Sequence, residues 1–467
     1  MAESVQVPSS REFSRVVPLA IAGGLLMEGL DSTIIATSLP QMARSLSVTP
    51  AYLSLAITSY LLSLAIFIPI SGWMADRFGA RRVYCIAIAI FTVSSAFCAL
   101  ASGLGFLVAM RILQGLGGAM MSPVARLILL RSFPKSQYLV ATAYMTTPAL
   151  IGPIAGPVLG GFITQYFSWH WIFLINIPVG IANILLVLKL VENIPPQRTG
   201  PFDFAGFLLV GAGLAMAQFG LECIGHQIFP LVWQVALVVG SAGALLLYRA
   251  YARRRANPVI ELKLFSLPNY SASILWGGVA RIGAAGTSFL LPLFFQVGFG
   301  YTPVHAGTLV LVSMVGALFM RAGFAPLLRT MGLRNVLIGN GVLMTLMLAG
   351  FTTFQADSPT WILMIYLFVF GFLRSVQFLS LNMLSYADLT GDMVSKGSSL
   401  YVAGQRLSMS ASVAVAAVVL SMASRATGVV GERQFHWSFA TLALMEAISQ
   451  YGFWRLDRNA GHEVTNG

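Results

Sequence analysis

Long apolar stretches recur along the whole chain, and only short polar connections separate them. A helix needs about 20 largely apolar residues to cross the hydrocarbon core of a bilayer. Fourteen stretches come near this length, so the pattern predicts an all-α polytopic membrane protein with fourteen transmembrane helices. The predicted spans lie near residues 16–38, 52–74, 83–101, 105–127, 137–161, 169–190, 204–221, 230–250, 271–297, 304–326, 335–354, 360–382, 398–423 and 437–456.

The composition supports the same class and excludes others. Hydrophobic residues make up 57% of the chain and charged residues 9%, whereas soluble domains carry roughly 45–50% and roughly 25%. A net charge of +12 would suit nucleic acid, but the basic residues lie between apolar spans and form no basic face of a soluble domain, so we expect no nucleic-acid partner. The three cysteines have neither pairing nor metal-ligand spacing, and no GxxxxGK loop is present, so we expect no disulfide, metal, cofactor or ATP-driven step.

The basic residues predict the orientation in the membrane. Of the 28 lysines and arginines, 19 lie in alternate connections on one side and 3 on the other. Positive charge gathers on the cytoplasmic side, so both termini are expected there, in a multi-pass protein of the cytoplasmic (inner) membrane. The first apolar run carries acids and continues to Thr37, and is therefore expected to be a span rather than a cleaved signal.

A faint internal repeat predicts how the spans are grouped. The segment "GARRV" begins at Gly79 after the second span, and "GLRNV" begins at Gly332 after the tenth. Parallel repeats of six helices are typical of large secondary transporters. We therefore expect a six-helix bundle over 1–190, two additional helices and a basic cytoplasmic loop over 191–265, and a second six-helix bundle over 266–467.

The first span contains two acids in the stretch "LLMEGLDSTII". Glu28 and Asp31 lie three residues apart and so share one face of a helix. A carboxylate at the bilayer centre costs about 2.5–3.5 kcal/mol on insertion scales, which marks both as candidate functional residues. Arg111 of the fourth span lies at nearly the depth of Asp31, so an ion pair is expected if the two helices are neighbours. Such a pair is either a proton switch or a static link, and the second acid favours the switch.

Five stretches together resemble the major facilitator superfamily, in particular its fourteen-helix drug:proton antiporter branch and, within it, the MdtD-type multidrug exporters. They are "LDSTIIATSLP" from Leu30, "GWMADRFGARR" from Gly72, "RILQGLGGA" from Arg111, "GPIAGPVLGG" from Gly152 and "SWHWIFLINIPVG" from Ser168. The resemblance covers nearly the whole chain, with the motifs in family order. Ala36 departs from the asparagine that family members usually have there.

The resemblance implies a conformational latch in the connection after the second span. Its residues are Gly72, Asp76, Arg77, Gly79 and Arg81. In the family the acid, here Asp76, is held against a helix N-terminus of the other half, where exposed N–H groups favour an anion by about 0.3–1 kcal/mol. Simple anchoring by positive charge is the alternative, but it does not account for the acid.

The fifth span carries what the resemblance identifies as the antiporter signature. Its residues are Gly152, Pro153, Gly156, Pro157, Gly160 and Gly161. Glycines four residues apart allow helix backbones to pack closely, so packing alone is the competing explanation. The resemblance adds that the signature implies exchange of two species rather than uniport.

A second group of charged residues points to a substrate cavity in the C-terminal half. Arg281, Arg374 and Arg406 are all expected roughly 12–15 Å from the cytoplasmic boundary, with Glu446 as their only obvious acidic partner. Excess buried positive charge would suit a carboxylate- or phosphate-bearing substrate. Bonds to backbone carbonyls or snorkelling towards the interface would explain the arginines equally well.

The function that follows is a proton-coupled antiporter that exports small organic molecules by alternating access, of the multidrug efflux type. The alternative is export of an anionic metabolite such as a carboxylate or its metal chelate. The expected partners are a small-molecule substrate, protons and the lipid bilayer, and we expect a monomer. A membrane enzyme would need a polar catalytic cluster at one interface, and a sensor would need a soluble output domain; neither is found in the sequence, so no enzymatic activity is expected.

Overall fold

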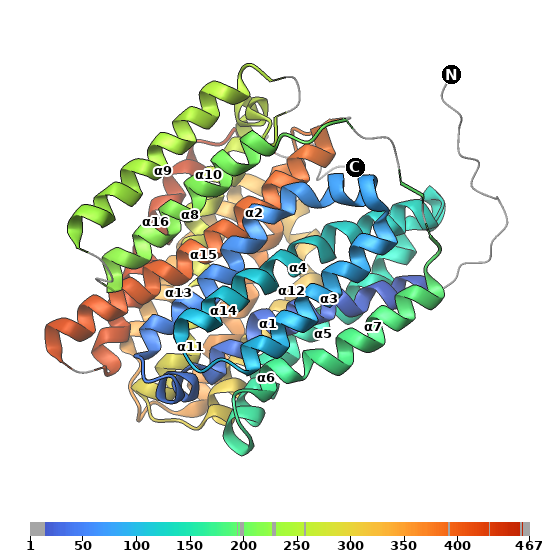
Figure 1. The fold of residues 1–467 in the computed structure, drawn as a ribbon. Helices are drawn as coiled ribbons and strands as arrows, with labels where there is room; N and C mark the ends of the chain where they lie inside the picture. The colour runs from blue at the N-terminus through green and yellow to red at the C-terminus, as the bar shows by residue number, and fades with distance from the viewer. Residues whose placement is uncertain are drawn as a thin grey trace.

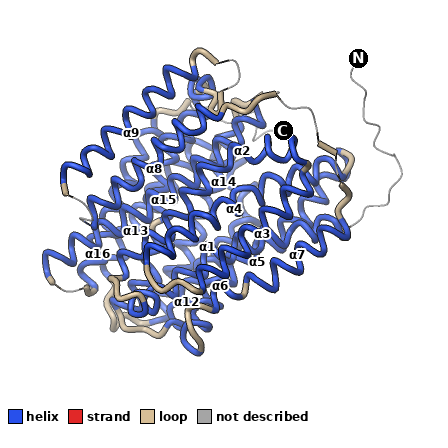
Figure 2. The backbone as a smooth tube through the Cα atoms, in the orientation of Figure 1, coloured by secondary structure: helices blue, strands red, loops and turns tan. Residues whose placement is uncertain are grey.

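The computed structural model describes residues 15–193, 195–196, 200–226, 230–255, 258–390, 393–428, 430–457 and 460. All regular structure in these ranges is helical, and the long helices run side by side along one direction (Figures 1 and 2). The predicted cytoplasmic termini fall on residues 1–14 and 461–467, which lie outside the described ranges.

The first half of the bundle runs from α1 to α7. Its helices are α1 (Val16–Ser45), α2 (Ser54–Phe78), α3 (Ala80–Ala99), α4 (Leu104–Ser132), α5 (Lys135–Tyr166), α6 (Trp171–Leu174) and α7 (Asn176–Leu190). Helix α1 packs along α5, and α3 packs between α4 and α7. Helix α1 continues to Ser45, about two turns past the predicted end of its span, because helix and apolar run need not end together. We call the end of the bundle that carries Ser45 the outer end, as the charge distribution predicts.

Two additional helices, α8 (Phe204–His226) and α9 (Leu231–Ala252), follow the first half. They pack against each other at one edge of the bundle (Figure 1). Helix α8 also contacts α2 and α15, whereas many large apolar side chains of α9 are exposed. Such an apolar outer face is what a lipid-facing helix requires.

The second half runs from α10 to α16. Its elements are α10 (Pro268–Ala285), α11 (Thr287–Leu293), the π-helical turn η3 (Phe294–Gly298), α12 (Pro303–Met331), α13 (Leu333–Gly350), α14 (Thr360–Tyr386), α15 (Met393–Thr427) and α16 (Glu432–Trp454). Helix α12 packs on α14, and α16 packs on α10 and α13.

The predicted architecture, two six-helix halves with two additional helices, is confirmed. Within the described ranges, 13 segments are long and apolar enough to cross a membrane; α6–α7 form one of them, and α10, α11 and η3 form another. The fourteenth predicted span corresponds to α16, which is less apolar because its buried face carries polar side chains such as Gln434, Glu446 and Ser449. This helix nevertheless lies within the bundle.

The two halves meet through α5 against α12 and through α2 against α15. At Gly161 of α5, an added Cβ would lie well inside 3.0 Å of the Pro303 carbonyl oxygen, and the same holds for Gly307 of α12 and the Pro157 carbonyl. Gln296 also donates to the Thr37 carbonyl at 2.9 Å. The halves are therefore in tight contact at the outer end.

Candidate functional site

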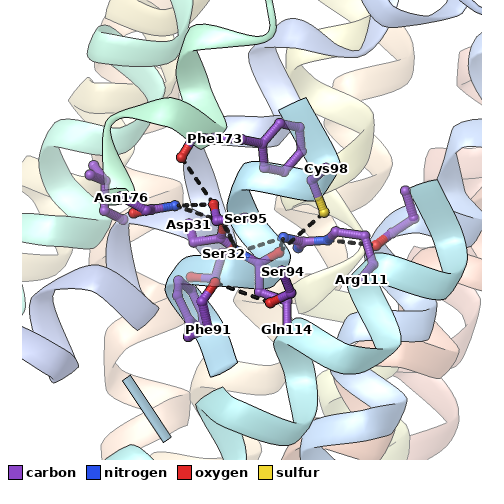
Figure 3. A network of polar contacts seen from close by, with 12 residues as sticks. Asp31, Ser32, Phe91, Ser94, Ser95, Cys98, Arg111, Gln114, Phe173 and Asn176 are labelled. Atoms are coloured by element: carbon purple, nitrogen blue, oxygen red, sulfur yellow. Dashed lines mark hydrogen bonds and ion pairs between the residues drawn. The ribbon is translucent and has the colours of Figure 1, made fainter. Parts of the chain in front are cut away.

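Asp31 of α1 and Arg111 of α4 form a buried ion pair. Their side chains are 1% and 0% exposed, and Arg111 Nη1 donates to Asp31 Oδ2 at 2.6 Å (Figure 3). Helix α4 packs on α2 and α3 and also contacts α1, which brings the guanidinium to the carboxylate. The structure thus joins the two residues whose predicted depths agreed.

Two further polar side chains contact the carboxylate of Asp31, and a third, Ser95, links them to each other. Gln114 Nε2 and Asn176 Nδ2 donate to Asp31 Oδ1 at 2.9 and 3.4 Å, and both amides also donate to Ser95 Oγ. Ser95 donates in turn to the Phe173 carbonyl (Figure 3). Both oxygens of Asp31 therefore accept hydrogen bonds, as buried polar groups generally do.

No role was predicted for Gln114, Asn176 and Ser95 from the sequence. Gln114 lies in the quoted segment "RILQGLGGA", three residues after Arg111 and so on the same helix face, and Asn176 lies in "SWHWIFLINIPVG". Polar residues inside those two motifs were the available signal. Ser95 had no comparable signal, because serine is common in membrane helices.

The guanidinium of Arg111 has partners beyond the acid. Its Nε donates to the Ala56 carbonyl at 3.1 Å, and its centre lies 4.2 Å from the ring centroid of Tyr60. Arg111 Nη2 has no hydrogen-bond partner among the described residues. Removing one charged side chain of a buried ion pair destabilises a protein by about 3–5 kcal/mol, because the remaining charge is left uncompensated.

Glu28, one turn from Asp31 on α1, pairs with the opposite half of the protein. Arg406 of α15 donates to Glu28 Oε1, and the carboxylate side chain is 6% exposed. This corrects the expectation that Glu446 is the acidic partner of the arginines of the second half. Depth along the helices could not distinguish the two acids, because the pairing depends on which face of α1 meets α15.

The other members of the predicted cavity group also find separate partners. Arg281 bonds the Tyr401 hydroxyl, with its guanidinium 4.8 Å from that ring's centroid. Arg374 lies 5.9 Å from the Phe370 ring centroid, and no acid of the described residues pairs with it. Glu446 accepts a hydrogen bond from Gln377. The structure therefore does not bring these four residues together as one charged cluster.

The connection after α2 differs from the implied latch in the partner of its acid. Asp76 accepts a hydrogen bond from Arg131, in the last turn of α4, rather than from a helix N-terminus of the second half among the described residues. Arg81 bonds the Leu188 carbonyl at the end of α7, and Arg77 is exposed. In this conformation the segment therefore ties α2, α3, α4 and α7 of one half together.

Two turns of the predicted repeat have the same geometry. Gly79 ends α2 with φ 91°, and Gly332 ends α12 with φ 73°. This left-handed region is open to glycine without steric cost, so both turns depend on the residue. An added Cβ at Gly72 would meet nothing within 4 Å, and packing does not explain that glycine.

The glycines of α5 divide between two neighbours. Added Cβ atoms at Gly152, Gly156 and Gly160 would all come within 3.0 Å of atoms of α1, whereas Gly161 faces α12 of the other half. The ring of Pro153 packs where a Cβ of Gly29 would lie. The segment thus brings α5 against the helix of the two acids and against the opposite half.

The chain matches the family model described as "Major Facilitator Superfamily" over residues 21–413. It is 37% identical to a protein of Cronobacter sakazakii named multidrug resistance protein MdtD, with 93% of each chain covered. A protein of the same name from Pectobacterium carotovorum is 38% identical, with 90% of each chain covered.

Solved transporter structures resemble the fold at low sequence identity. The POT family transporter PepTSo has a TM-score of 0.68 and 17% identity, covering 96% of this chain and 100% of its own. A D-xylose–proton symporter has a TM-score of 0.66 and 13% sequence identity, covering 96% of this chain and 98% of its own. A bacterial homologue of the human lysosomal transporter Spinster, in an inward-facing conformation, has a TM-score of 0.65 and 14% sequence identity, covering 95% of this chain and 97% of its own.

Proposed function

Because this chain belongs to the Major Facilitator Superfamily, we propose that it is a proton-coupled antiporter that exports small organic molecules of the multidrug type. Its relatives are named multidrug resistance proteins, and they cover nearly the whole chain. The buried Asp31–Arg111 pair carries the proposal, because a carboxylate deep in a membrane bundle is costly to keep unless it has a use.

Asp31 is the proposed carrier of the coupled proton. A proton on Asp31 cancels its charge and weakens its bond to Arg111, which leaves the guanidinium with the Gln114 and Ala56 oxygens. Release of the proton restores a carboxylate with three donors around it. The site therefore has two differently bonded states that a proton selects, as a coupling site requires.

Glu28 connects this proton site to the movement of the halves. Asp31 is bonded wholly within the first half, whereas Glu28, on the same face of α1, is bonded to Arg406 of the second half. A shift of α1 on protonation of Asp31 therefore strains the bond that joins the halves. A cationic substrate in the cavity would compete with Arg406 for Glu28.

An inward-facing conformation is consistent with the contacts between the halves. Ser410 of α15 donates to the Thr58 carbonyl of α2, and the Val304 N–H donates to Gln165 Oε1. The Val304–Gln165 bond lies at the outer ends of α12 and α5, whereas the Glu28–Arg406 pair lies near the middle of the bundle. In alternating access, the contacts at the outer end would open as the halves rock.

Two arginines favour the anionic alternative for the substrate. Arg281 and Arg374 lie in the second half, and no acid of the described residues pairs with either. A carboxylate or phosphate bound at either guanidinium would supply the missing charge. Export of an anionic metabolite or its metal chelate is therefore the second candidate function.

Two bundles and two additional helices make up the whole chain. The boundaries are 1–190, 191–265 and 266–467 for the two bundles and the additional helices between them. The protein lies in the cytoplasmic membrane as a monomer with both termini inside, and it carries out no enzymatic reaction. A reporter fused at Arg254 should therefore give a cytoplasmic signal.

Inverted membrane vesicles with an imposed pH gradient test the function. With an acidic interior, vesicles containing the wild-type protein should accumulate a transported compound and lose it when a protonophore collapses the gradient. The screen compares cationic dyes with organic carboxylates, and vesicles without the protein are the control. Accumulation that ignores the pH gradient would contradict proton coupling, and accumulation of carboxylates alone would replace the multidrug function by the second candidate.

A further inference from the structure

The second half of the bundle contains a buried acid, Glu446, that pairs with no cation among the described residues. Glu446 of α16 is 0% exposed, and its Oε1 accepts a hydrogen bond from the amide of Gln377 on α14. Its Oε2 has no hydrogen-bond partner among the described residues and lies against Gly283 of α10. An ionised carboxylate in this position would be costly, because the side chain is shielded from bulk solvent and no described positive charge pairs with it.

Other polar side chains lie at the same depth as Glu446. Ser380 of α14 and Asn340 of α13 are buried, and their side-chain polar atoms have no partner among the described residues. Together with Gln377 and Glu446, they lie six to nine residues from the inner ends of their helices, or about 9–14 Å. They form a polar layer in the inner half of the second bundle.

The charged and titratable groups of the elements packed against α16 make their contacts elsewhere. Three of these elements, η3, η4 (Phe351–Thr353) and α11, carry no titratable residue. The charged groups of the other elements, with the partners they contact, are Arg281 of α10 with Tyr401 of α15, Arg334 of α13 with the Trp454 carbonyl, Arg374 of α14 with the Phe370 ring, and Lys396, Arg406 and Arg425 of α15 with Glu261, Glu28 and Ser421. The hydroxyls of Tyr270 on α10 and Tyr366 on α14 donate to the Gly397 and Met347 carbonyls. No described cation pairs with Glu446.

The sequence around Gln377 repeats a feature of the Asp31 site. "RILQ" runs from Arg111 to Gln114 and "RSVQ" from Arg374 to Gln377, on the fourth long helix of each half. In both, the glutamine amide donates to a buried acid of a neighbouring helix. In the first half the arginine pairs with the same acid, whereas Arg374 does not.

We propose that Glu446 is a second proton-binding site, which holds its proton in this conformation of the protein. The proposal rests on the proton-coupled function above and adds a site in the opposite half. As the carbonyl oxygen of a protonated acid, Oε1 accepts from Gln377, and Oε2 carries the proton. Arg374 lies one turn from Gln377 on the same face of α14, so its approach to Glu446 in the other conformation would favour release.

Infrared difference spectroscopy of the purified full-length protein tests the protonation state directly. Near neutral pH, the wild type should show the C=O stretching band of a buried protonated carboxylic acid, shifted in D₂O and absent from Glu446→Gln. Asp31→Asn is the matched control and should retain the band. A wild-type spectrum whose carboxylic band is unchanged in Glu446→Gln would overturn the proposal, and so would loss of the band on adding sodium at constant pH.

A second variant keeps the test decisive if Glu446→Gln does not fold. Gln377→Leu removes the amide donor, so the band should move to higher frequency because the carbonyl oxygen loses its hydrogen bond. An unmoved band in folded Gln377→Leu would assign it to another acid and contradict the proposal.

Transport separates this proposal from the proposed function. In proteoliposomes, the number of protons exchanged per molecule of a dye found in the vesicle screen should fall by one in Glu446→Gln. If transport is not driven by protons at all, the proposed function fails while the infrared band still reports on Glu446. If proton-driven transport persists with an unchanged ratio, the second site is wrong and the proposed function stands.

Discussion

Replacement of Gly161 by alanine should shift the protein out of the conformation described here. Gly161 of α5 lies against the Pro303 carbonyl oxygen of α12, and an added Cβ would come well inside 3.0 Å of that oxygen. Real Cβ atoms almost never approach so closely, and the obstructing atom is backbone rather than a flexible side chain. The outer ends of the two halves must therefore separate to accept the methyl group.

The size of the effect follows from the cost of overpacking. One extra methyl group in a tightly packed contact costs about 1–3 kcal/mol. The cost applies only while the outer ends of α5 and α12 touch, so it changes the balance between closed and open outer ends. A difference of about 1–3 kcal/mol corresponds to a shift of about 5- to 150-fold in that equilibrium.

Distances between spin labels at the outer end measure this balance. Labels on cysteines introduced at Ser45 and Asp357, which are exposed in the two halves, should give a longer population in Gly161→Ala than in the unsubstituted protein. Gly323→Ala on α12 is the matched control, because its added Cβ meets nothing within 4 Å. Gly160→Ala clashes with α1 of its own half and should lower the melting temperature instead.

Two results would refute the reasoning. One is an unchanged distance distribution in well-folded Gly161→Ala, which would mean that α12 absorbs the methyl group locally. The other is an equal shift in Gly323→Ala, which would mean that any added methyl group on these helices alters the balance.

Three further substitutions test the charged sites. Asp31→Asn should abolish proton-driven export in vesicles yet leave substrate counterflow measurable, because the amide resembles the protonated carboxyl; proton-driven export at the wild-type rate would contradict the role. Glu28→Gln should have a milder effect, strongest for cations, measured as the ratio of export rates for cationic and anionic substrates; a ratio equal to that of the wild type would remove Glu28 from substrate selection. Asp76→Asn should slow export without preventing folding, since its partly exposed bond to Arg131 contributes about 0.2–1 kcal/mol; export at an unchanged rate in a well-expressed protein would reduce the segment to an anchor.

The apolar pattern predicted the fold well because a bilayer imposes one length and one kind of structure on every span. It was least informative for α16, where Glu446 and its polar neighbours lower the hydropathy of a helix that the bundle encloses. The depth of a residue in the membrane can be calculated because a helix rises by a fixed amount per residue. The matching depths of Asp31 and Arg111 therefore predicted their pairing. In both cases one coordinate along the membrane normal was sufficient.

The pairings that sequence analysis missed depend on rotation about the helix axis and on which helices become neighbours. Glu446 was the expected partner of Arg406, but Arg406 turns towards Glu28 on the other half, and Glu446 turns towards Gln377. Asp76 was expected to contact a distant helix N-terminus and instead bonds Arg131 of its own half. Short motifs of five or ten residues in a single sequence do not indicate how a helix is rotated or which helices become its neighbours.

The pairing of Glu28 with Arg406 determines which charges are open to a substrate. Since Glu28 is already neutralised, a cation gains its attraction only by displacing a guanidinium that is itself only 22% exposed. An anion meets no such competitor at Arg281 or Arg374, where aromatic rings and neutral groups are the neighbours. If Asp31 carries the coupled proton as proposed, its protonation would perturb α1 and the bond of Glu28, and would thereby govern whether Arg406 is free to bind an anion. Under this proposal, the two acids in one turn of α1 would join proton binding to substrate selection, whichever sign the substrate carries.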